Sequence, residues 1–229
     1  MTLGQHIYAI KNIIANGPSS DDSPFSEGLV AHFLQITRAF LLERKADKYR
    51  YISEQSFQSV CVDLELSSFH NCCDLPELEC KVLKSTIKLP KLLNSKWGNF
   101  LKVMDLSGNI IPEYNITNNK FAEFGIVKPT TGTVGWFLHD GYIYALNSKV
   151  LAKILVNGLY LNSTEVLEVN CANGTSTNCS DINSQEFPID ADLINDMYKA
   201  TLEYLIRSTG LPNDLENNAK DIETTNAKQ

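Results

Sequence analysis

The amino-acid sequence predicts an α+β protein. It combines a small helical bundle built from both ends of the chain, a large antiparallel β insertion and an extended C-terminal tail. Two observations support this prediction. Apolar residues recur with the helical period of about 3.6 in residues 1–56 and 187–210, and with the strand period of about 2 in residues 57–186. Because each end segment has an apolar face to cover, we expect the ends to pack together, with residues 57–186 inserted between them and residues 211–229 as the tail.

The first helix is predicted to begin at residue 3. Leu3, Ile7, Ile10 and Ile14 lie at helical spacing and form one apolar stripe. Thr2 precedes the stripe, and the glutamine three residues later completes the spacing of a capping box, in which each side chain satisfies a backbone N–H of the other. A Gly-Pro pair at residues 17–18 ends the helix.

The second helix is predicted over residues 24–46, with the serine at position 23 as its cap and a proline in its first turn. Its apolar stripe is wide, so we expect it to contact more than one neighbour, and we take Phe33 and Phe40 as candidate partner-binding residues. The stripe comprises Leu29, Phe33, Ile36 and Phe40, with Val30, Leu34 and Leu41 beside it. Arg38, Arg44 and Lys45 are expected near the exposed end, where cations suit the helix dipole.

The middle of the chain is predicted to form short antiparallel strands. Val60, Val62 and Leu64 alternate with polar residues. The strongest hairpin signal spans residues 135–146, because the Asp140-Gly141 pair tolerates the positive φ angles of a type I′ turn. We also expect a strand pair or a bulged strand over residues 153–161 and one more strand over residues 165–169. Regularly spaced short strands favour an antiparallel sandwich or a barrel-like module.

The third helix is predicted to begin after residue 188, with Asp190 as its cap, and to end before Gly210. The tail that follows holds only two large aliphatic residues after its start, Leu215 and Ile222. So polar a segment cannot bury enough surface to order alone. We therefore expect Leu215 and Ile222 either to bind a partner or to remain in a disordered tail.

Composition bounds the class of protein. The chain has 229 residues, 43% hydrophobic and 21% charged, which is ordinary for a soluble globular protein. Its net charge of −7 argues against a globally basic nucleic-acid binder, although a local basic patch remains open. No apolar run reaches the roughly 18 residues needed to cross a membrane, and we expect no secretory signal and no membrane partner.

Cysteine and histidine residues suggest a weak metal candidate. His70, Cys72, Cys73 and Cys80 form a local group, but their spacing does not match the short knuckles of structural zinc sites. Cysteines without a secretory signal usually remain thiols. For the six cysteines, thiols, disulfides at loop tips and zinc ligation therefore all stay open, with thiols preferred. They are Cys61, Cys72, Cys73, Cys80, Cys171 and Cys179.

A run of six lysines has no acidic residue between its ends: Lys81, Lys84, Lys88, Lys91, Lys96 and Lys102. Such a run can contact a DNA backbone or an acidic partner. Lysines on an exposed strand also simply prevent edge-to-edge aggregation, and we prefer this interpretation.

Catalytic chemistry is not indicated. His139-Asp140 could be a base held by a carboxylate, but the pair lies at the predicted hairpin tip, where the aspartate is needed for the turn. The chain contains no nucleotide-binding loop, metalloprotease motif or nucleophile elbow. We expect no enzymatic activity and no cofactor. The aromatic residues of the hairpin, Trp136, Phe137, Tyr142 and Tyr144, either form the core of the sheet or bind carbohydrate.

Several segments together resemble the head–tail connector proteins, also called ring or adaptor proteins, of crAss-like bacteriophages. These segments are residues 21–26, 41–49, 80–90, 135–144, 186–190 and 217–221. The resemblance extends over nearly the whole chain, although no single segment is as specific as a metal or nucleotide motif.

This resemblance implies a non-enzymatic virion protein assembled in the bacterial cytoplasm. Its copies would form a ring, typically of about twelve, at the head–tail interface below the portal. The ring would contact the portal on one side and other ring or tail proteins on the other, around passing genomic DNA that it binds only weakly. Two alternatives are a nucleic-acid-binding module that uses the lysines of residues 81–102, and a receptor-binding or carbohydrate-binding tail protein.

Overall fold

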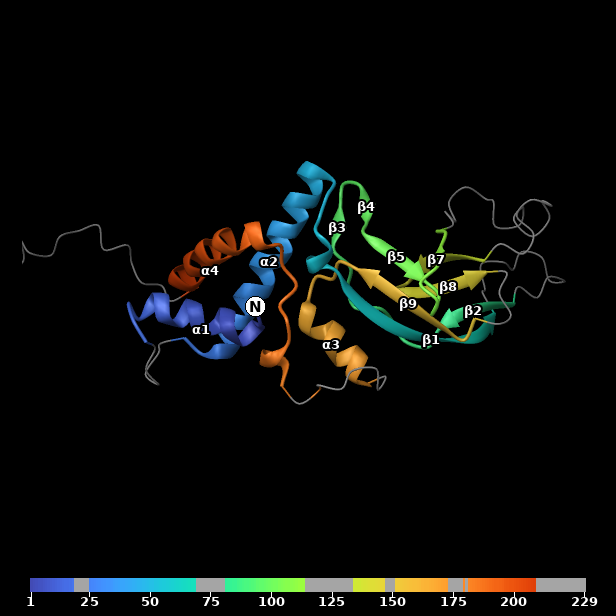
Figure 1. Ribbon diagram of the computed structural model, residues 1–229, viewed down its shortest axis with the longest axis horizontal. Coiled ribbons are helices and arrows are strands. Elements are labelled where there is room, and N and C mark those ends of the chain that lie inside the picture. Colours follow the sequence, from blue (N-terminus) through green and yellow to red (C-terminus); the bar gives the residue numbers. More distant parts are fainter. Residues whose placement is uncertain are drawn as a thin grey trace, which may run out of the picture.

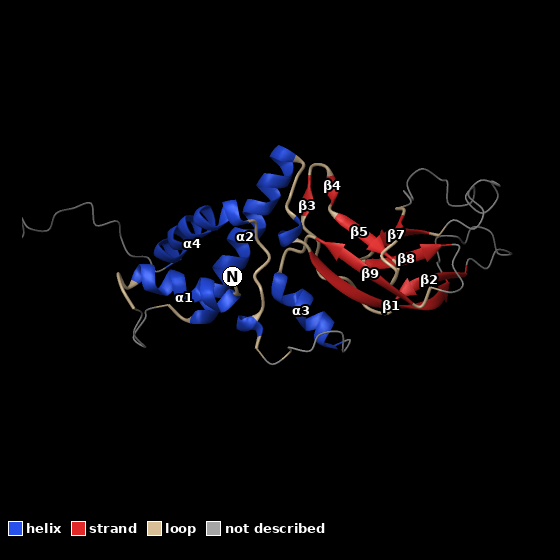
Figure 2. Ribbon diagram, viewed as in Figure 1, coloured by secondary structure: helices blue, strands red, loops and turns tan. Residues whose placement is uncertain are grey.

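A computed structural model describes residues 1–18, 25–68, 81–113, 134–146, 151–172, 179 and 181–208. The helices that come from the two ends of the chain gather at one end of the molecule and the strands at the other, with one further helix beside the sheet, as Figure 1 and Figure 2 show. The helices are α1 (Leu3–Ile14), α2 (Glu27–Tyr49), α3 (Ser163–Ala172) and α4 (Ile194–Ser208). The predicted class, a mixture of helices and antiparallel sheet, is confirmed.

Local capping signals explain where the first two helices begin. At α1 the predicted capping box is present, with the Thr2 hydroxyl accepting from the Gln5 backbone and the Gln5 side chain accepting from the Thr2 backbone. Helix α2 begins later than predicted, because Ser26 is its N-cap and accepts a hydrogen bond from the Leu29 N–H. It ends at Arg50, whose left-handed φ of 53° stops the helix after Tyr49.

Helices from the two ends of the chain share one hydrophobic core. Residues of α1, α2, α4 and the segments just before α2 and α4 bury their side chains in it: Leu3, Ile7, Ile10, Phe25, Val30, Leu34, Leu41, Phe187, Ile189, Met197 and Leu205. Helix α2 runs obliquely past α1 and α4 and extends toward the sheet (Figure 1). Its second half enters a different cluster, made of Ala39, Leu42, Ala46, Ile52, Leu93 and Leu159. Helix α2 therefore packs into hydrophobic clusters at both ends of the molecule.

A seven-stranded antiparallel sheet forms the other end, in the order β6-β5-β9-β1-β2-β8-β7. The strands are β1 (Gln58–Ser68), β2 (Lys81–Ser85), β5 (Leu101–Met104), β6 (Ile110–Ile111), β7 (Gly135–His139), β8 (Tyr142–Leu146) and β9 (Lys153–Gly158). A separate small hairpin pairs β3 (Asn94–Ser95) with β4 (Gly98–Asn99). The long strand β1 pairs with β9 through residues 58–63 and with β2 through residues 64–68, so it links the two halves of the sheet.

The sheet is nearly closed, because its two edge strands approach each other. Glu113, just after β6, forms a bridge with Trp136 in β7. The Trp136 backbone N–H donates to the Pro112 carbonyl at 3.0 Å, and its indole N–H donates to the Ile111 carbonyl at 2.9 Å. Closure removes the open strand edges that promote aggregation. The interior holds branched side chains such as Val60, which is fully buried.

The strand predictions are partly right. The hairpin of β7 and β8 turns at Asp140 and Gly141, both at positive φ (52° and 81°), as a type I′ turn requires. Residues 165–169 were predicted as a strand, which is wrong, since they lie inside helix α3. The spacing of Val166 and Val169 also suits a helix face, and both side chains join the interior cluster of the sheet. Residues 153–161 form one strand, β9, followed by an irregular bridge between Leu92 and Tyr160.

Candidate functional site

A buried arginine joins the middle of helix α2 to the segment after β9 and to the segment before α4. Arg38 is fully buried; its Nε donates to the Pro188 carbonyl at 2.5 Å and its Nη1 to the Tyr160 carbonyl at 2.9 Å. Burial lowers the pKa of Arg38 to about 9. The expectation of an exposed Arg38 was therefore wrong. A signal for its burial was present, because Arg38 lies four residues after Leu34 and four before Leu42, both of which are buried.

A second polar contact at this junction centres on the buried carboxylate of Asp190. It accepts hydrogen bonds from the hydroxyls of Ser53 and Ser56, the latter at 2.5 Å, and pairs with Lys45 at 2.6 Å. The same ammonium group contacts Asp192 at 2.8 Å. Burial raises the pKa of Asp190, but the hydrogen bonds from Lys45, Ser53 and Ser56 outweigh burial and leave this pKa below its ordinary value.

Asp190 is therefore not the helix cap that its position suggested. The segment continues through a 3₁₀ turn (Ala191–Leu193) into α4, and the carboxylate of Asp190 makes no capping hydrogen bond there. The carboxylate instead accepts hydrogen bonds from Ser53 and Ser56, which lie between α2 and β1. Asp190 therefore connects the segment before α4 to the segment before the first strand of the sheet.

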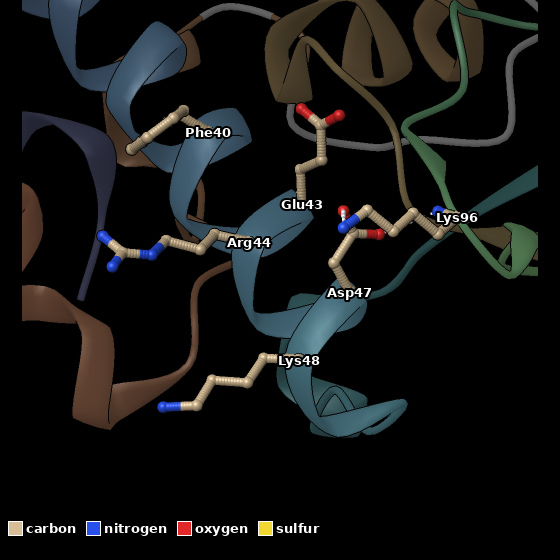
Figure 3. A pocket seen from close by; sticks show the side chains of 6 residues that line it. All are labelled: Phe40, Glu43, Arg44, Asp47, Lys48 and Lys96. Atoms are coloured by element: carbon tan, nitrogen blue, oxygen red, sulfur yellow. Dashed lines mark hydrogen bonds and ion pairs between the residues drawn. The ribbon is translucent and has the colours of Figure 1, made fainter.

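The outer side of α2 carries a pocket of about 430 Å³. Five side chains of α2 and one from the β3–β4 turn line it (Figure 3): Phe40, Glu43, Arg44, Asp47, Lys48 and Lys96. The Lys96 backbone N–H donates to Asp47 at 2.7 Å, and its ammonium group lies 4.0 Å from the same carboxylate. Arg44 and Lys48 are exposed and extend from the helix away from this pair. The helix and the hairpin thus form one continuous surface.

Exposed aromatic side chains surround this pocket. Phe40 and Trp97 are each 53% exposed, and Tyr49 and Tyr51 are more exposed still. The Trp97 indole N–H donates to the Asp47 carbonyl at 3.2 Å, and the Arg50 guanidinium lies 3.2 Å from the centre of the Trp97 ring. Large exposed aromatic and arginine side chains held in place are typical of the residues that dominate protein interfaces.

We call this region the α2-end surface. It comprises Phe40, Glu43, Arg44, Asp47, Lys48, Tyr49, Arg50, Tyr51, Lys96 and Trp97. Four cations and two carboxylates give it a formal net charge of +2, in a chain whose net charge is −7. Sequence reasoning did not predict this surface, because residues of α2 and of the hairpin meet only in the fold.

The two phenylalanines proposed as partner contacts have different surroundings. Phe33 is half-buried, and its ring stacks on Tyr204 of α4 with centroids 5.8 Å apart. Ile36 is 41% exposed, and Phe40 is itself part of the α2-end surface. Phe40 is thus available to a partner, whereas Phe33 mainly packs inside the chain. A partner-binding role for either residue stays a prediction.

The run of lysines is spread over the sheet. Lys84 in β2 lies 4.0 Å from the Tyr142 ring centre, and the stem of Lys88 packs on Gly141 at the hairpin tip. Lys96 belongs to the α2-end surface, and Lys102 lies on β5, which β9 and β1 separate from β2. Of the remaining two, Lys81 begins β2 and Lys91 is exposed beside β3. Contact with DNA through these lysines stays a prediction.

Among the residues that the structure describes, one pair of cysteines is oxidised. Cys171 at the end of α3 and Cys179 form a disulfide, with their Cα atoms 5.6 Å apart, so the preferred thiol state is wrong for this pair. His70, Cys72, Cys73, Cys80, Leu215 and Ile222 lie outside the described residues. Within the described ranges, no three potential metal ligands lie together.

The remaining candidates are explained by the sheet. His139 lies 3.4 Å from Asp140 at the hairpin tip, where the aspartate side chain is mostly exposed. Trp136, Phe137 and Tyr144 are buried, so these rings form packing surfaces rather than an exposed platform for sugars. No helix in the described part of the chain has both the length and the apolar character of a membrane span.

Comparison with known proteins places these features in context. The family described as phage tail ring protein 2 matches residues 5–224. "Ring protein 2" of Bacteroides phage crAss001 is 26% identical over 233 residues, which cover 96% of this chain and 97% of that protein. The match therefore includes both helical ends, the sheet and the α2-end surface.

Proposed function

This chain belongs to the phage tail ring protein 2 family, and from that premise we propose that it is a non-enzymatic structural protein of the virion. Its copies form a ring of about twelve in the head–tail connector, below the portal. The ring links the portal to other ring or tail proteins around the DNA channel. The observation that carries this proposal is the family match over nearly the whole chain, to which the α2-end surface adds a region suited to assembly.

The fold supports this role through its rigidity. A ring subunit must hold its two contact surfaces at a constant angle, or the ring does not close. Helix α2 enters two hydrophobic clusters, Arg38 binds the Tyr160 carbonyl just after β9, and Lys45 pairs with Asp190, which accepts a hydrogen bond from Ser56 just before β1. We propose that residues 1–56 and 187–210 act as the helical unit and residues 57–186 as the β module, joined rigidly by α2.

We propose that residues 211–229 contribute a second contact, to the portal or to a neighbouring subunit. Leu215 and Ile222 are the apolar anchors of this segment. A segment that orders on binding loses conformational entropy but can cover a large surface. Deletion of residues 211–229 should leave a folded chain that no longer enters the particle; normal incorporation would contradict this role.

Electron cryo-microscopy of purified phage particles tests the proposed function. We expect a closed ring of this chain at the head–tail interface, touching the portal or the ring beneath it. Density for this chain in a trimeric receptor-binding fibre, or its absence from the particle, would refute the proposal.

A further inference from the structure

Acidic residues are segregated from basic ones along this chain. Residues 154–198 contain seven carboxylates and no lysine or arginine: Glu165, Glu168, Asp181, Glu186, Asp190, Asp192 and Asp196. Lys45 pairs with both Asp190 and Asp192. Glu165, Glu168, Asp181, Glu186 and Asp196 have no lysine or arginine in this segment.

Three of these carboxylates lie around helix α3. Glu165 and Glu168 are three residues apart on α3, and Asp181 begins the turn that returns past this helix. A hollow of about 70 Å³, lined by residues of both segments, lies between α3 and the turn. Ile182 beside it is 39% exposed, as is Leu161 just before α3. We call Glu165, Glu168, Asp181 and Ile182 the acidic face.

The acidic face and the α2-end surface lie on opposite sides of the molecule. Figure 1 shows the C-terminal end of α2 at the top of the view and α3 at the bottom. A contact between two different, opposed faces joins subunits head to tail, which is the arrangement that a ring requires.

Charge and apolar content match across such a contact. Arg44, Lys48 and Arg50 on one side would meet Glu165, Glu168 and Asp181 on the other. The exposed rings of Phe40 and Trp97 would meet the exposed Ile182. Charge complementarity of this kind steers association and sets the register of two surfaces.

The same charges disfavour the competing twofold contacts. If two α2-end surfaces met, the net charge of +2 on each copy would face the same sign on the other. If two acidic faces met, their carboxylates would approach each other. Because like charges repel at an interface, the head-to-tail contact between the two different surfaces is favoured over either twofold contact.

We infer that the α2-end surface of one copy docks onto the acidic face of a second copy. This inference rests on the proposed function, since it names the contact by which the ring grows. It predicts that the side chains of Arg44, Lys48 and Arg50 become buried against α3 of the adjacent subunit.

Charge reversal with rescue tests the inference on the full-length chain. The R44E/K48E and E165K/E168K variants should each weaken self-association by about tenfold or more, because one surface then faces its own sign. The variant with all four substitutions restores opposite charges and should associate within about threefold of the wild type. Analytical ultracentrifugation measures the association, and thermal unfolding confirms that each variant is folded.

The chain provides a matched control. Asp196 lies in the first turn of α4 as Glu165 does in α3, and Glu203 is an exposed residue of α4. The D196K/E203K variant changes the net charge by the same amount, outside the acidic face, and should associate like the wild type. If it weakens association as much as E165K/E168K, net charge rather than this contact governs assembly and the inference is wrong.

The outcomes separate the contact from the function. If the wild type forms rings and every charge-reversal variant forms the same rings equally well, the contact is refuted and the ring function stands. If rings form only on particles, zero-length crosslinking of purified particles should join Lys48 to Glu168 of a different copy, and absence of that crosslink would refute the contact. A chain that forms no ring in solution or on particles would refute the proposed function itself.

Discussion

The two sides of helix α2 carry the same kinds of residue with opposite consequences. On the inner side, Arg38 is fully buried and donates to two backbone carbonyls. On the outer side, six residues later, Arg44 is exposed and lines a pocket. Arg38 stabilises the fold, because its removal leaves buried acceptors without a donor. Arg44 is exposed and is therefore available for contacts between subunits. Burial, not residue type, assigns these roles.

Loss of the inner arginine should have the largest effect on stability. The R38A variant leaves the Pro188 and Tyr160 carbonyls without their donor and opens a cavity, so we expect a loss of about 3–5 kcal/mol in the free energy of unfolding. The R44A variant, as the outer control, should change it by less than about 0.5 kcal/mol. Urea titration measures both, and equal effects would contradict the contrast between the two sides.

A buried histidine provides the next largest effect. His6 is buried between Phe187 and Tyr198, and its Nδ1 lies 2.8 Å from the Tyr198 hydroxyl. Burial, helped by repulsion from the chain's amino terminus, lowers the pKa of His6 to about 4. Between the unfolded value of 6.5 and about 4, the unfolded chain binds a proton that the folded chain does not, so stability falls as the pH falls.

The loss in the free energy of unfolding caused by His6 should reach about 3 kcal/mol when the pH has fallen to about 4. Unfolding measured at several pH values detects it. The H6Q variant should lack that part of the pH dependence, while H32Q, at an exposed residue of α2, should retain it. An unchanged pH profile in H6Q would show that His6 is not the group responsible.

The two carboxylates that share Lys45 sharpen the same contrast. Asp190 is buried and also accepts from two serines, whereas Asp192 is mostly exposed. We expect D190N to lose about 2 kcal/mol at neutral pH and D192N less than about 0.5 kcal/mol. Because the pKa of Asp190 is lowered, its contribution is present above the unfolded value of 3.8 and disappears as the pH falls below it. Equal losses in the two variants would show that burial does not distinguish them.

The smallest stability effect belongs to the outer surface. An R44A/K48A variant should unfold within about 0.5 kcal/mol of the wild type, since exposed charges contribute little. Its self-association should nevertheless be weaker than that of the wild type, by an amount that shrinks as salt is added. Denaturation and sedimentation of the same preparation test both statements. A large stability loss would mean that these side chains belong to the fold.

Local signals predicted a good part of the fold. The capping box at Thr2 and the turn at Asp140-Gly141 were predicted because each depends on residues within a few positions of one another. Helix α3 was missed, since residues 165–169 are compatible with both periods and only the interior cluster of the sheet, which buries Val166, selects the helix.

The candidate site was much less predictable. Trp97 and Asp47 meet across 50 positions of the sequence, and Arg50 reaches the same ring only because α2 ends beside the β3–β4 hairpin. The lysine run pointed to a single basic region, but Lys84 and Lys102 lie on strands that two others separate. Contacts of this range carry no signature in a local pattern.

The sequence by itself determined the class of fold, the starts of its first and last helices to within a few residues and the tightest turn. Those features follow from backbone hydrogen bonds and dihedral preferences over short stretches. The tertiary structure alone decided which arginine is buried, where the Asp190 carboxylate points and which charged side chains face outward. A charged group is stable in the interior only where distant segments supply its partners, and those segments come together only when the chain folds.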